Sequence, residues 1–191
     1  MKDTIRTFIA FELPEPIIQL AADLQMRLKS HGLKVRWVRP QNMHLTVKFL
    51  GDVAKGRIGD AAEAMHRASR SAVPMVVTAQ GLGVFPGIRK SRVLWFGLGG
   101  RVDLLTEAHR LLEDELVERG FAREGRPFRA HLTLARIKQR LDARKLLESI
   151  EDVGSYPPVE FQLTEWVLFK SELRPQGALY TPLERIALSG R

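Results

Sequence analysis

Short runs in which apolar and polar residues alternate are separated along this chain by stretches whose apolar residues recur every three or four positions. Period-two alternation predicts strands, and the three-to-four spacing predicts helices that are buried on one face. Strands are expected over residues 5–12, 34–39, 43–50, 74–85, 92–97, 128–137, 158–171 and 178–187. Helices are expected over residues 14–30, 56–71, 102–118 and 141–150. The pattern predicts an α+β protein.

The predicted elements alternate in two similar halves, and no low-complexity tract or flexible linker separates the halves. Each half offers a helix-backed sheet, so two sheets are expected to meet at a central cleft. The chain has 191 residues, of which 45% are hydrophobic, and this is enough to bury a substantial core. We therefore expect a single domain, residues 1–191, made of two intimately packed lobes, and we expect a monomer.

Charge and composition narrow the possible functions. Lysine and arginine total 30 against 22 acidic residues, and the net charge of +8 raises the local concentration of polyanions such as RNA. The absence of cysteine excludes disulfides, thiolate nucleophiles and cysteine-based zinc sites. No run approaches the ~18 apolar residues of a membrane span, and residues 1–4 lead into a strand rather than a signal sequence. A soluble, cytoplasmic protein without membrane contact is expected.

One tetrapeptide pattern occurs twice, as HLTV at residues 44–47 and as HLTL at residues 131–134. Chance would place two His-Leu-Thr triplets in a chain of this composition roughly one time in a thousand or less. Residues i and i+2 of a strand point to the same face, so His44 shares a face with Thr46, and His131 shares a face with Thr133. Two such strands brought together would form a cleft that holds two imidazoles and two hydroxyls.

This set of groups suits displacement at a phosphodiester, which needs a base for the attacking oxygen and an acid for the leaving oxygen. Histidine can serve as either, because its unperturbed pKa of about 6.5 lets both protonation states coexist near neutral pH. Threonine hydroxyls can donate hydrogen bonds to the non-bridging oxygens, where the transition state needs stabilisation. We therefore predict that His44 and His131 are catalytic and that Thr46 and Thr133 bind the substrate, with no metal or cofactor.

The motifs and their surroundings resemble the RNA 2′,3′-cyclic phosphodiesterases, historically called 2′-5′ RNA ligases, of the 2H phosphoesterase superfamily. The resemblance covers essentially the whole chain. Besides the two motifs it rests on RTFIAFE at residues 6–12, WVRP at 37–40, RVLW at 92–95, the arginine at 136, and SEL to GALY at 171–180. One departure is Ala130, where relatives often carry proline before the second histidine.

The resemblance implies a bilobal, pseudo-two-fold fold with two antiparallel sheets backed by helices. It implies that the substrate is RNA or an oligonucleotide ending in a 2′,3′-cyclic phosphate, which is opened to a 2′-phosphate as O3′ leaves. It also places Arg136 against the substrate phosphate. On an ideal strand Arg136 would face away from His131, so this role requires a bulge or the end of the strand. Which histidine is the base stays open, because the pseudo-symmetry makes them nearly equivalent.

Other polar and aromatic residues are weaker candidates. By parity, Lys48 shares the face of His44 and Thr46, and the alternative is a solvated surface lysine without a role at the site. A basic loop that could follow an RNA backbone contains Arg89, Lys90 and Arg92. Aromatic residues that could stack on a base are Phe11, Trp37, Phe85 and Phe128. The histidines that lack a partner motif, and receive no catalytic role, are His31, His66 and His109.

Three alternative functions remain. The first is reversible 2′-5′ RNA ligation at the same site. The second is a non-catalytic basic RNA-binding module, although binding alone needs only cations and stacking surfaces and would not require both histidines and both threonines. The third is a metal hydrolase with the two histidines as ligands, and here the sequence lacks nearby His or Asp partners at ligand spacing.

Overall fold

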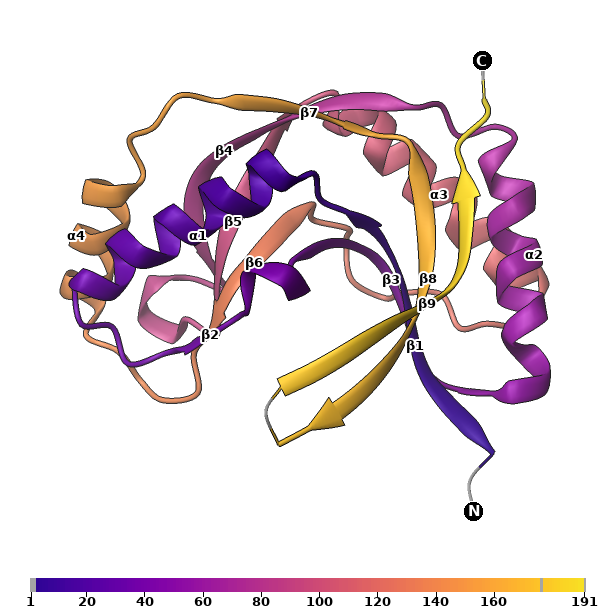
Figure 1. Ribbon diagram of the computed structural model, residues 1–191, viewed down its shortest axis with the longest axis horizontal. Helices are drawn as coiled ribbons and strands as arrows, with labels where there is room; N and C mark the ends of the chain where they lie inside the picture. The colour runs from indigo at the N-terminus through magenta and orange to yellow at the C-terminus, as the bar shows by residue number, and fades with distance from the viewer. Residues whose placement is uncertain (1–2, 176, 191) are drawn as a thin grey trace.

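The computed structural model describes residues 3–175 and 177–190, so residues 1, 2, 176 and 191 of the expected domain lie outside the described residues. Within the described ranges the strands form two antiparallel sheets, one of four strands and one of five (Figure 1). The helices are α1 (Glu15–Ser30), α2 (Ile58–Ser69), α3 (Val102–Glu118) and α4 (Ala143–Val153). The predicted α+β class with two antiparallel sheets is confirmed.

Each sheet has a defined strand order. The four-stranded sheet runs β3 (His44–Ala54), β1 (Thr4–Glu12), β8 (Glu165–Arg174) and β9 (Gly177–Ala187). The five-stranded sheet runs β2 (Arg36–Trp37), β6 (His131–Arg136), β5 (Val93–Gly100), β4 (Met75–Phe85) and β7 (Val159–Leu163). Short 3-10 helices in the connections are η1 (Pro40–Asn42), η2 (Lys55–Arg57) and η3 (Ile88–Lys90).

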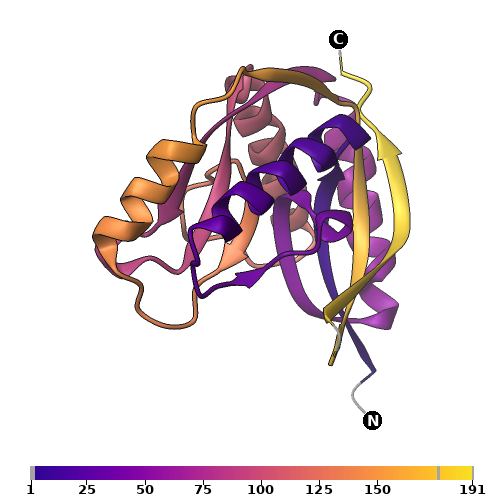
Figure 2. The same cartoon turned by 60° about the vertical axis from the view of Figure 1, so that its left-hand side comes forward.

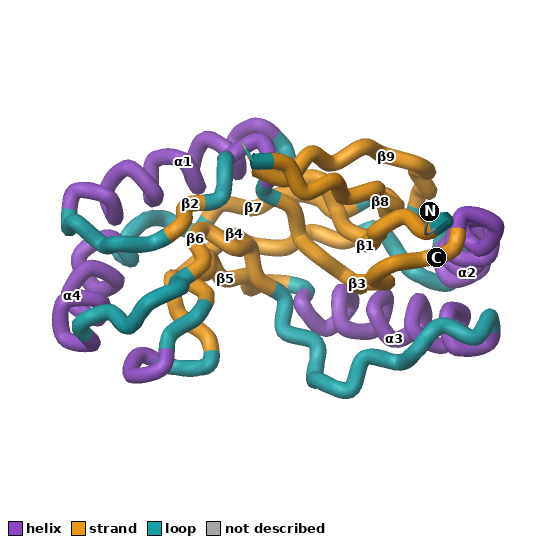
Figure 3. Tube along the Cα trace, turned by 90° about the horizontal axis from the view of Figure 1, so that it is seen from below, coloured by secondary structure: helices purple, strands orange, loops and turns teal. Residues whose placement is uncertain are grey.

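The two sheets are not built from the two halves of the sequence. Strands β8 and β9, near the C-terminal end, join β1 and β3, whereas β2 from the N-terminal half joins β6. The helices are divided between the sheets in a similar way. Helices α1 and α4 lie together beside the five-stranded sheet, and α2 and α3 lie beside the four-stranded sheet (Figures 1, 2 and 3). The chain therefore crosses between the sheets more than once.

The hydrophobic core is one contiguous cluster that draws on both sheets and on all four of these helices. Representative members with no exposed surface are Ile9, Leu45, Leu105, Leu132 and Leu146. A second, smaller cluster lies on the opposite face of the four-stranded sheet and consists of Phe8, Ala10, Val167 and Phe169, with Tyr180 packed against it. Strand β1 is thus buried on both faces, because Phe8 and Ala10 alternate with Ile9 and Phe11.

Helix α1 illustrates how the sequence determines where a helix begins, where it ends and which face is buried. It begins after Pro14, with a second proline in its first turn, and it ends before Gly32, whose φ of +67° suits a glycine past a helix end. Its buried stripe recurs at the three-to-four spacing of one helix face and consists of Ile17, Ala21, Leu24, Gln25 and Leu28.

Several predicted strands have other bounds than the observed ones; for example, the strand predicted over residues 43–50 extends to Ala54 and the one predicted over 92–97 extends to Gly100. The strand predicted over residues 34–39 is reduced to Arg36–Trp37, and the strand predicted from residue 128 begins at His131. The long strand predicted over residues 158–171 is two strands, because the chain leaves the five-stranded sheet after Leu163 and enters the four-stranded sheet at Glu165. The backbone carbonyl of Thr164, between them, accepts a hydrogen bond of 2.8 Å from Leu188.

Candidate active site

The two motif strands contact each other where the two sheets meet. Strand β3 begins at His44 and strand β6 begins at His131, and these strands are neighbours although they belong to different sheets. Burial lowers the pKa of both histidines, and the positive charge of Arg136 lowers it further, so both imidazoles lie within the electrostatic reach of Arg136. The structure therefore brings both motifs and Arg136 together. We call the region formed by His44, Thr46, His131 and Thr133 the motif junction.

Both histidines are oriented in the same way. Nδ1 of His44 lies 2.9 Å from the backbone carbonyl of Asn42, and Nδ1 of His131 lies 2.6 Å from the carbonyl of Arg129. A carbonyl oxygen can only accept a hydrogen bond, so Nδ1 carries the proton in the neutral form of each ring. The Nε2 lone pair of each ring is then left to accept a proton.

A β-bulge in β6 determines where Arg136 points. Ala135 pairs with Leu94 and Thr133 pairs with Trp95, so Leu134 is an extra residue without a partner on β5. Leu134 and Ala135 are both fully buried, and Arg136 is exposed. The bulge returns Arg136 to the face that carries His131 and Thr133. The bulge that the predicted phosphate contact requires is present.

Strand β3 has the same bulge at the same distance from its histidine. Thr46 pairs with Ala10 and Lys48 pairs with Ile9, so Val47 is the extra residue. The bulge turns Lys48 away from His44, and the prediction that Lys48 shares the face of His44 and Thr46 is wrong. The Lys48 side chain is only 5% exposed, and its ammonium lies 2.6 Å from the carboxylate of Glu113 on α3. The exposed position after this bulge belongs to Phe49.

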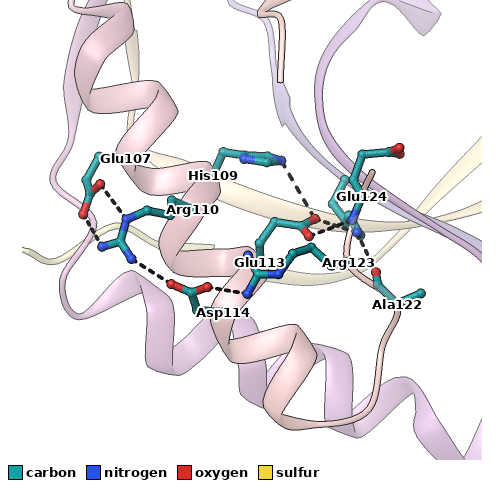
Figure 4. A network of polar contacts seen from close by, with 9 residues as sticks. Glu107, His109, Arg110, Glu113, Asp114, Ala122, Arg123 and Glu124 are labelled. Atoms are coloured by element: carbon teal, nitrogen blue, oxygen red, sulfur yellow. Dashed lines mark hydrogen bonds and ion pairs between the residues drawn. The ribbon is translucent and has the colours of Figure 1, made fainter. Parts of the chain in front are cut away.

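The buried carboxylate of Glu113 joins α3 to the segment that precedes the second motif (Figure 4). It accepts a hydrogen bond of 3.0 Å from the backbone N–H of Glu124, and Lys48 donates one of 2.8 Å to the carbonyl of Ala122. Nε2 of His109 lies 3.8 Å from the same carboxylate, and its ring stacks on Phe128 at 4.3 Å. Phe128 and His109 therefore belong to this packing and not to the motif junction.

The surroundings of His44 are mainly aromatic. Its ring centroid lies 4.6 Å from that of Phe8 and 5.2 Å from that of Tyr180, with Phe169 at 6.5 Å. Burial lowers the pKa of His44 to about 4, because an imidazolium loses its hydration there. The hydrogen bond to Asn42 acts in the opposite direction, and the charge of Arg136 lowers the pKa further.

The surroundings of His131 are more open and more positively charged. Its ring is perpendicular to that of Phe85, with the ring centroids 5.0 Å apart, and the guanidinium of Arg129 lies over Phe85 at 5.7 Å. Burial lowers the pKa of His131, with a smaller contribution of the same sign from Arg136, and the hydrogen bond to Arg129 opposes both. Among the aromatic residues predicted to stack on a base, Phe85 contacts a motif histidine, whereas Phe11 is 1% exposed in the core.

Trp37 contributes to packing outside the motif junction. The ammonium of Lys29 lies over its ring. Its backbone pairs with that of Ala135, a fully buried residue of β6. Within residues 3–175 and 177–190, the ring of Trp37 makes no ring contact with His44 or His131.

Two residues at the site were not predicted. Burial raises the pKa of the Tyr180 hydroxyl while Arg136 and Arg6 lower it, so this hydroxyl lies within reach of the Arg136 charge. Gln25 donates hydrogen bonds of 2.8 Å from Nε2 to the carbonyls of Leu134 and Val38, and it thereby holds the bulge of β6. A polar residue within the apolar stripe of α1 is the sequence signal that could have identified Gln25.

Potential metal ligands do not gather in the described part of the chain. Residues 3–175 and 177–190 contain no group of three or more His, Cys, Asp or Glu side chains placed to hold a metal ion.

No helix in these ranges is both long enough and apolar enough to cross a membrane.

Comparison with known proteins identifies similarity over nearly the whole length. Residues 11–95 and 101–180 match the family model described as LigT like Phosphoesterase. The chain is 33% identical over 180 residues to the RNA 2′,3′-cyclic phosphodiesterase of Methanothermobacter thermautotrophicus, a match that covers 94% of this chain and 97% of that protein. It is also 33% identical over 187 residues to the protein of the same name from Thermotoga maritima, with 97% of each chain covered.

Solved structures show the same likeness. A protein of Thermus thermophilus superposes with a TM-score of 0.78 at 27% identity, and the match covers 98% of this chain and 100% of that one. E. coli LigT in complex with 3′-AMP superposes with a TM-score of 0.73 at 25% identity, with 97% and 99% covered. These matches confirm the superfamily resemblance and the bilobal fold that it implied.

Proposed function

The chain belongs to the LigT-like phosphoesterase family, a family of hydrolases, and we propose that it hydrolyses the 2′,3′-cyclic phosphate ends of RNA to 2′-phosphate ends without a metal ion. One motif histidine removes a proton from water, whose oxygen then forms a bond to phosphorus. The P–O3′ bond breaks, and the other histidine gives its proton to O3′. The products are a 2′-phosphate and a free 3′-hydroxyl.

The observation that carries this proposal is the matched pair of histidines at the motif junction, with one arginine in reach of both. An in-line displacement needs an acid and a base near the same phosphorus, and His44 and His131 both experience the charge of Arg136. Each imidazole has its Nδ1 hydrogen-bonded to a carbonyl, so Nε2 is the nitrogen that exchanges the proton. Arg136, Thr46 and Thr133 hold the non-bridging oxygens and stabilise the charge that develops on them.

The names of the relatives support the choice of substrate. The relatives from Methanothermobacter thermautotrophicus and Thermotoga maritima are both called RNA 2′,3′-cyclic phosphodiesterases, and LigT of E. coli has been crystallised with 3′-AMP. The net charge of +8 favours a polyanionic substrate. Hydrolysis needs only water as a second reactant, whereas ligation would also need a second RNA end with a free 5′-hydroxyl at the same site.

The test is incubation of the protein with an oligonucleotide ending in a 2′,3′-cyclic phosphate, in excess EDTA, with the product phosphate position determined by NMR or by nuclease digestion. We expect a 2′-phosphate from the unmodified protein and almost none from His44→Ala or His131→Ala. His66→Ala is the matched control, because this histidine is half exposed on α2.

Each alternative predicts a different result. Loss of activity in EDTA with recovery on adding Zn²⁺ would indicate a metal hydrolase. An RNA product in which two oligonucleotides are joined, in place of a 2′-phosphate end, would indicate ligation. Tight binding with no product, unaffected by either alanine substitution, would indicate a binding module.

A further inference from the structure

A group of exposed cations surrounds the end of β6 that carries Arg136. Their positions follow from the strand pairing: β2 pairs with β6, and β6 pairs with β5. The guanidinium of Arg92, just before β5, donates to the carbonyl of Lys138. We define the cation surface as Lys34, Arg36, Arg92, Arg136 and Lys138. Within residues 3–175 and 177–190, none of these five side chains has an acidic partner.

Several cations on α2 and α3 are instead paired with carboxylates. On α3, Arg110 lies 2.6 Å from Glu107 and 2.7 Å from Asp114 (Figure 4). On α2, Arg67 lies 3.1 Å from Glu63. The segments that build the cation surface contain no acidic residue at all, because residues 24–51, 64–102 and 125–141 lack both Asp and Glu. The unpaired cations therefore follow from where the sequence places its carboxylates.

Two members of this surface face each other directly. Arg36 is the register partner of Arg136 across the β2–β6 pair, and both side chains are exposed on the same face. Like charges directly opposite each other destabilise a pair of strands. An anion bound between or beside the two guanidinium groups would remove this repulsion. The arrangement thus indicates a ligand with negative charge, independently of the histidines.

The surface continues from Arg136 into an open hollow. The hollow has a volume of about 530 Å³ and is lined by Lys34, Val35, Arg36, Lys138 and Gln139. The loop that follows β6 runs beside β2 here (Figures 1 and 2). A hollow of this size is in the range of sites for small molecules of nucleotide size. Positive charge therefore extends from the motif junction, across β2, and away from the histidines.

We propose that the cation surface binds internucleotide phosphates of the RNA strand whose cyclic end lies at the motif junction. This inference rests on the proposed function and adds that the protein recognises a strand and not only its last nucleotide. Arginine and lysine contacts to phosphates fix the position of a strand without reading its sequence. The protein should therefore prefer an oligonucleotide to a mononucleotide, and the preference should weaken as salt is added.

The experiment compares an RNA of about six nucleotides ending in a 2′,3′-cyclic phosphate with adenosine 2′,3′-cyclic phosphate. The variant is Lys34→Gln/Lys138→Gln, which removes two cations that lie away from the histidines. We expect kcat/KM for the oligonucleotide to fall about tenfold, and the slope of log kcat/KM against log salt to decrease by about 0.7 for each lost contact. The value for the mononucleotide should change by less than about twofold, since it has no internucleotide phosphate.

The matched control is Arg67→Gln/Arg70→Gln, in the last turn of α2 and directly after it, which removes the same net charge from exposed positions behind the other sheet. It should leave both substrates unaffected. If the unmodified protein treats both substrates alike, with the same salt dependence, the inference is overturned while the proposed function stands. The inference is also overturned if the control and the lysine variant lose the same activity, because the effect would then be general electrostatics.

A binding measurement separates this inference from the proposed function. Fluorescence anisotropy of the same RNA carrying a 2′-phosphate needs no turnover. If neither substrate is hydrolysed, the proposed function fails, and weaker RNA binding by Lys34→Gln/Lys138→Gln but not by the control would still support the surface. Equal binding by all three proteins would overturn it. Unchanged RNA binding together with lost binding to phosphatidylserine vesicles would overturn it in favour of a lipid surface.

Discussion

Strands β3 and β6 carry the same tetrapeptide pattern and the same bulge, yet they present different surroundings. In β3 the residue turned inward by the bulge is Lys48 and the next, exposed residue is Phe49. In β6 the corresponding residues are Ala135 and Arg136. The histidines and threonines are therefore equivalent, while the flanking positions supply rings on one side of the motif junction and positive charge on the other.

The two bulges are also held by different partners. Lys48 is held from the core side by the carboxylate of Glu113 on α3. The carbonyl of Leu134 is held by the amide of Gln25 on α1. A charged pair and a neutral hydrogen bond thus stabilise the same backbone irregularity. The motif therefore defines the reacting groups, which are the same in both strands. The residues after the motif determine whether a strand adds aromatic rings, as β3 does, or positive charge, as β6 does.

The largest effects are expected from the residues in which the two strands are equivalent. His44→Ala and His131→Ala should each lower kcat by about 10²- to 10⁴-fold, the usual size of a general acid–base contribution. The double variant should be little worse than either single one, because the pair acts as a unit. Steady-state kinetics with His66→Ala as the control checks this. Near-normal turnover in one single variant would show that only one strand supplies a reacting group.

The next effect concerns stability and should appear in β3 only. Lys48→Met leaves the Glu113 carboxylate buried without its partner, and removing one member of a buried ion pair costs about 3–5 kcal/mol. Lys48→Met/Glu113→Leu should recover most of this loss, since no buried charge remains. Urea unfolding measures both. The control is Arg110→Gln on α3, an exposed ion pair whose loss should leave the midpoint almost unchanged. A Lys48→Met protein as stable as the unmodified one contradicts the prediction.

Thr46→Val and Thr133→Val remove one hydroxyl from each strand and keep the shape of the side chain. Each substitution should raise the activation free energy of hydrolysis by roughly 1–3 kcal/mol, the scale of a hydrogen bond to a charged group. The loss should appear in kcat/KM with the fold unchanged by circular dichroism. Thr181→Val in β9, which is exposed, is the control. If Thr46→Val has no effect while Thr133→Val does, then the phosphate is held from β6 alone.

Gln25→Leu tests the support of the β6 bulge. The Leu134 carbonyl keeps its hydrogen bond from Val38 N–H, so the loss of stability should be only about 1–2 kcal/mol. Because Arg136 depends on the bulge for its direction, KM should rise more than kcat falls. Gln19→Leu, exposed on the same helix, is the control. A lower stability with unchanged KM would show that Gln25 supports the core but not the position of Arg136.

The elements and the reacting groups could be predicted from sequence because they depend on local patterns. Period-two and helical spacing identified the helices and most strands, and parity within the motifs placed each threonine with its histidine. The position of the bulges could not be derived, because it depends on cross-strand pairing with β1 and β5. This is why Lys48 and Arg136 were both assigned by parity to the opposite of the face that each occupies.

The division of residues 158–171 between two sheets was missed for the same reason. The buried positions change from odd numbers (Phe161, Leu163) to even numbers (Trp166, Leu168) across Thr164 and Glu165. Such a one-residue phase shift is also what a β-bulge within one strand would give, so the local pattern does not reveal the change of sheet. The change is visible in the pairing partners, which are β4 for the first part and β1 for the second. Tyr180 likewise reaches His44 through the pairing of β9 with β8, a contact between positions far apart in the chain.

The remaining effects concern pH and follow from the different burial of the two histidines. The pKa of His44 is about 4 in the folded protein against about 6.5 in the unfolded chain. Between these values the unfolded chain binds a proton that the folded protein does not, so stability falls as pH falls from about 6.5 to 4. The loss reaches about 3 kcal/mol at most, and above pH 6.5 it is absent. His44→Gln should remove most of this slope in urea unfolding at a series of pH values, and His66→Gln should retain it.

The lowered pKa values of the two histidines should also shift the pH dependence of activity. The profile of kcat/KM reports the free enzyme, in which burial lowers the pKa of both His44 and His131, so its maximum should lie on the acid side of 6.5. The profile of kcat reports the enzyme with substrate bound, where the phosphate anion favours the imidazolium form and raises both pKa values. The kcat profile should therefore lie at higher pH than the kcat/KM profile. The two limbs describe the coupled pair and not single residues. Coincident profiles, with chemistry shown to be rate-limiting, would mean that the phosphate is not held within reach of the histidines.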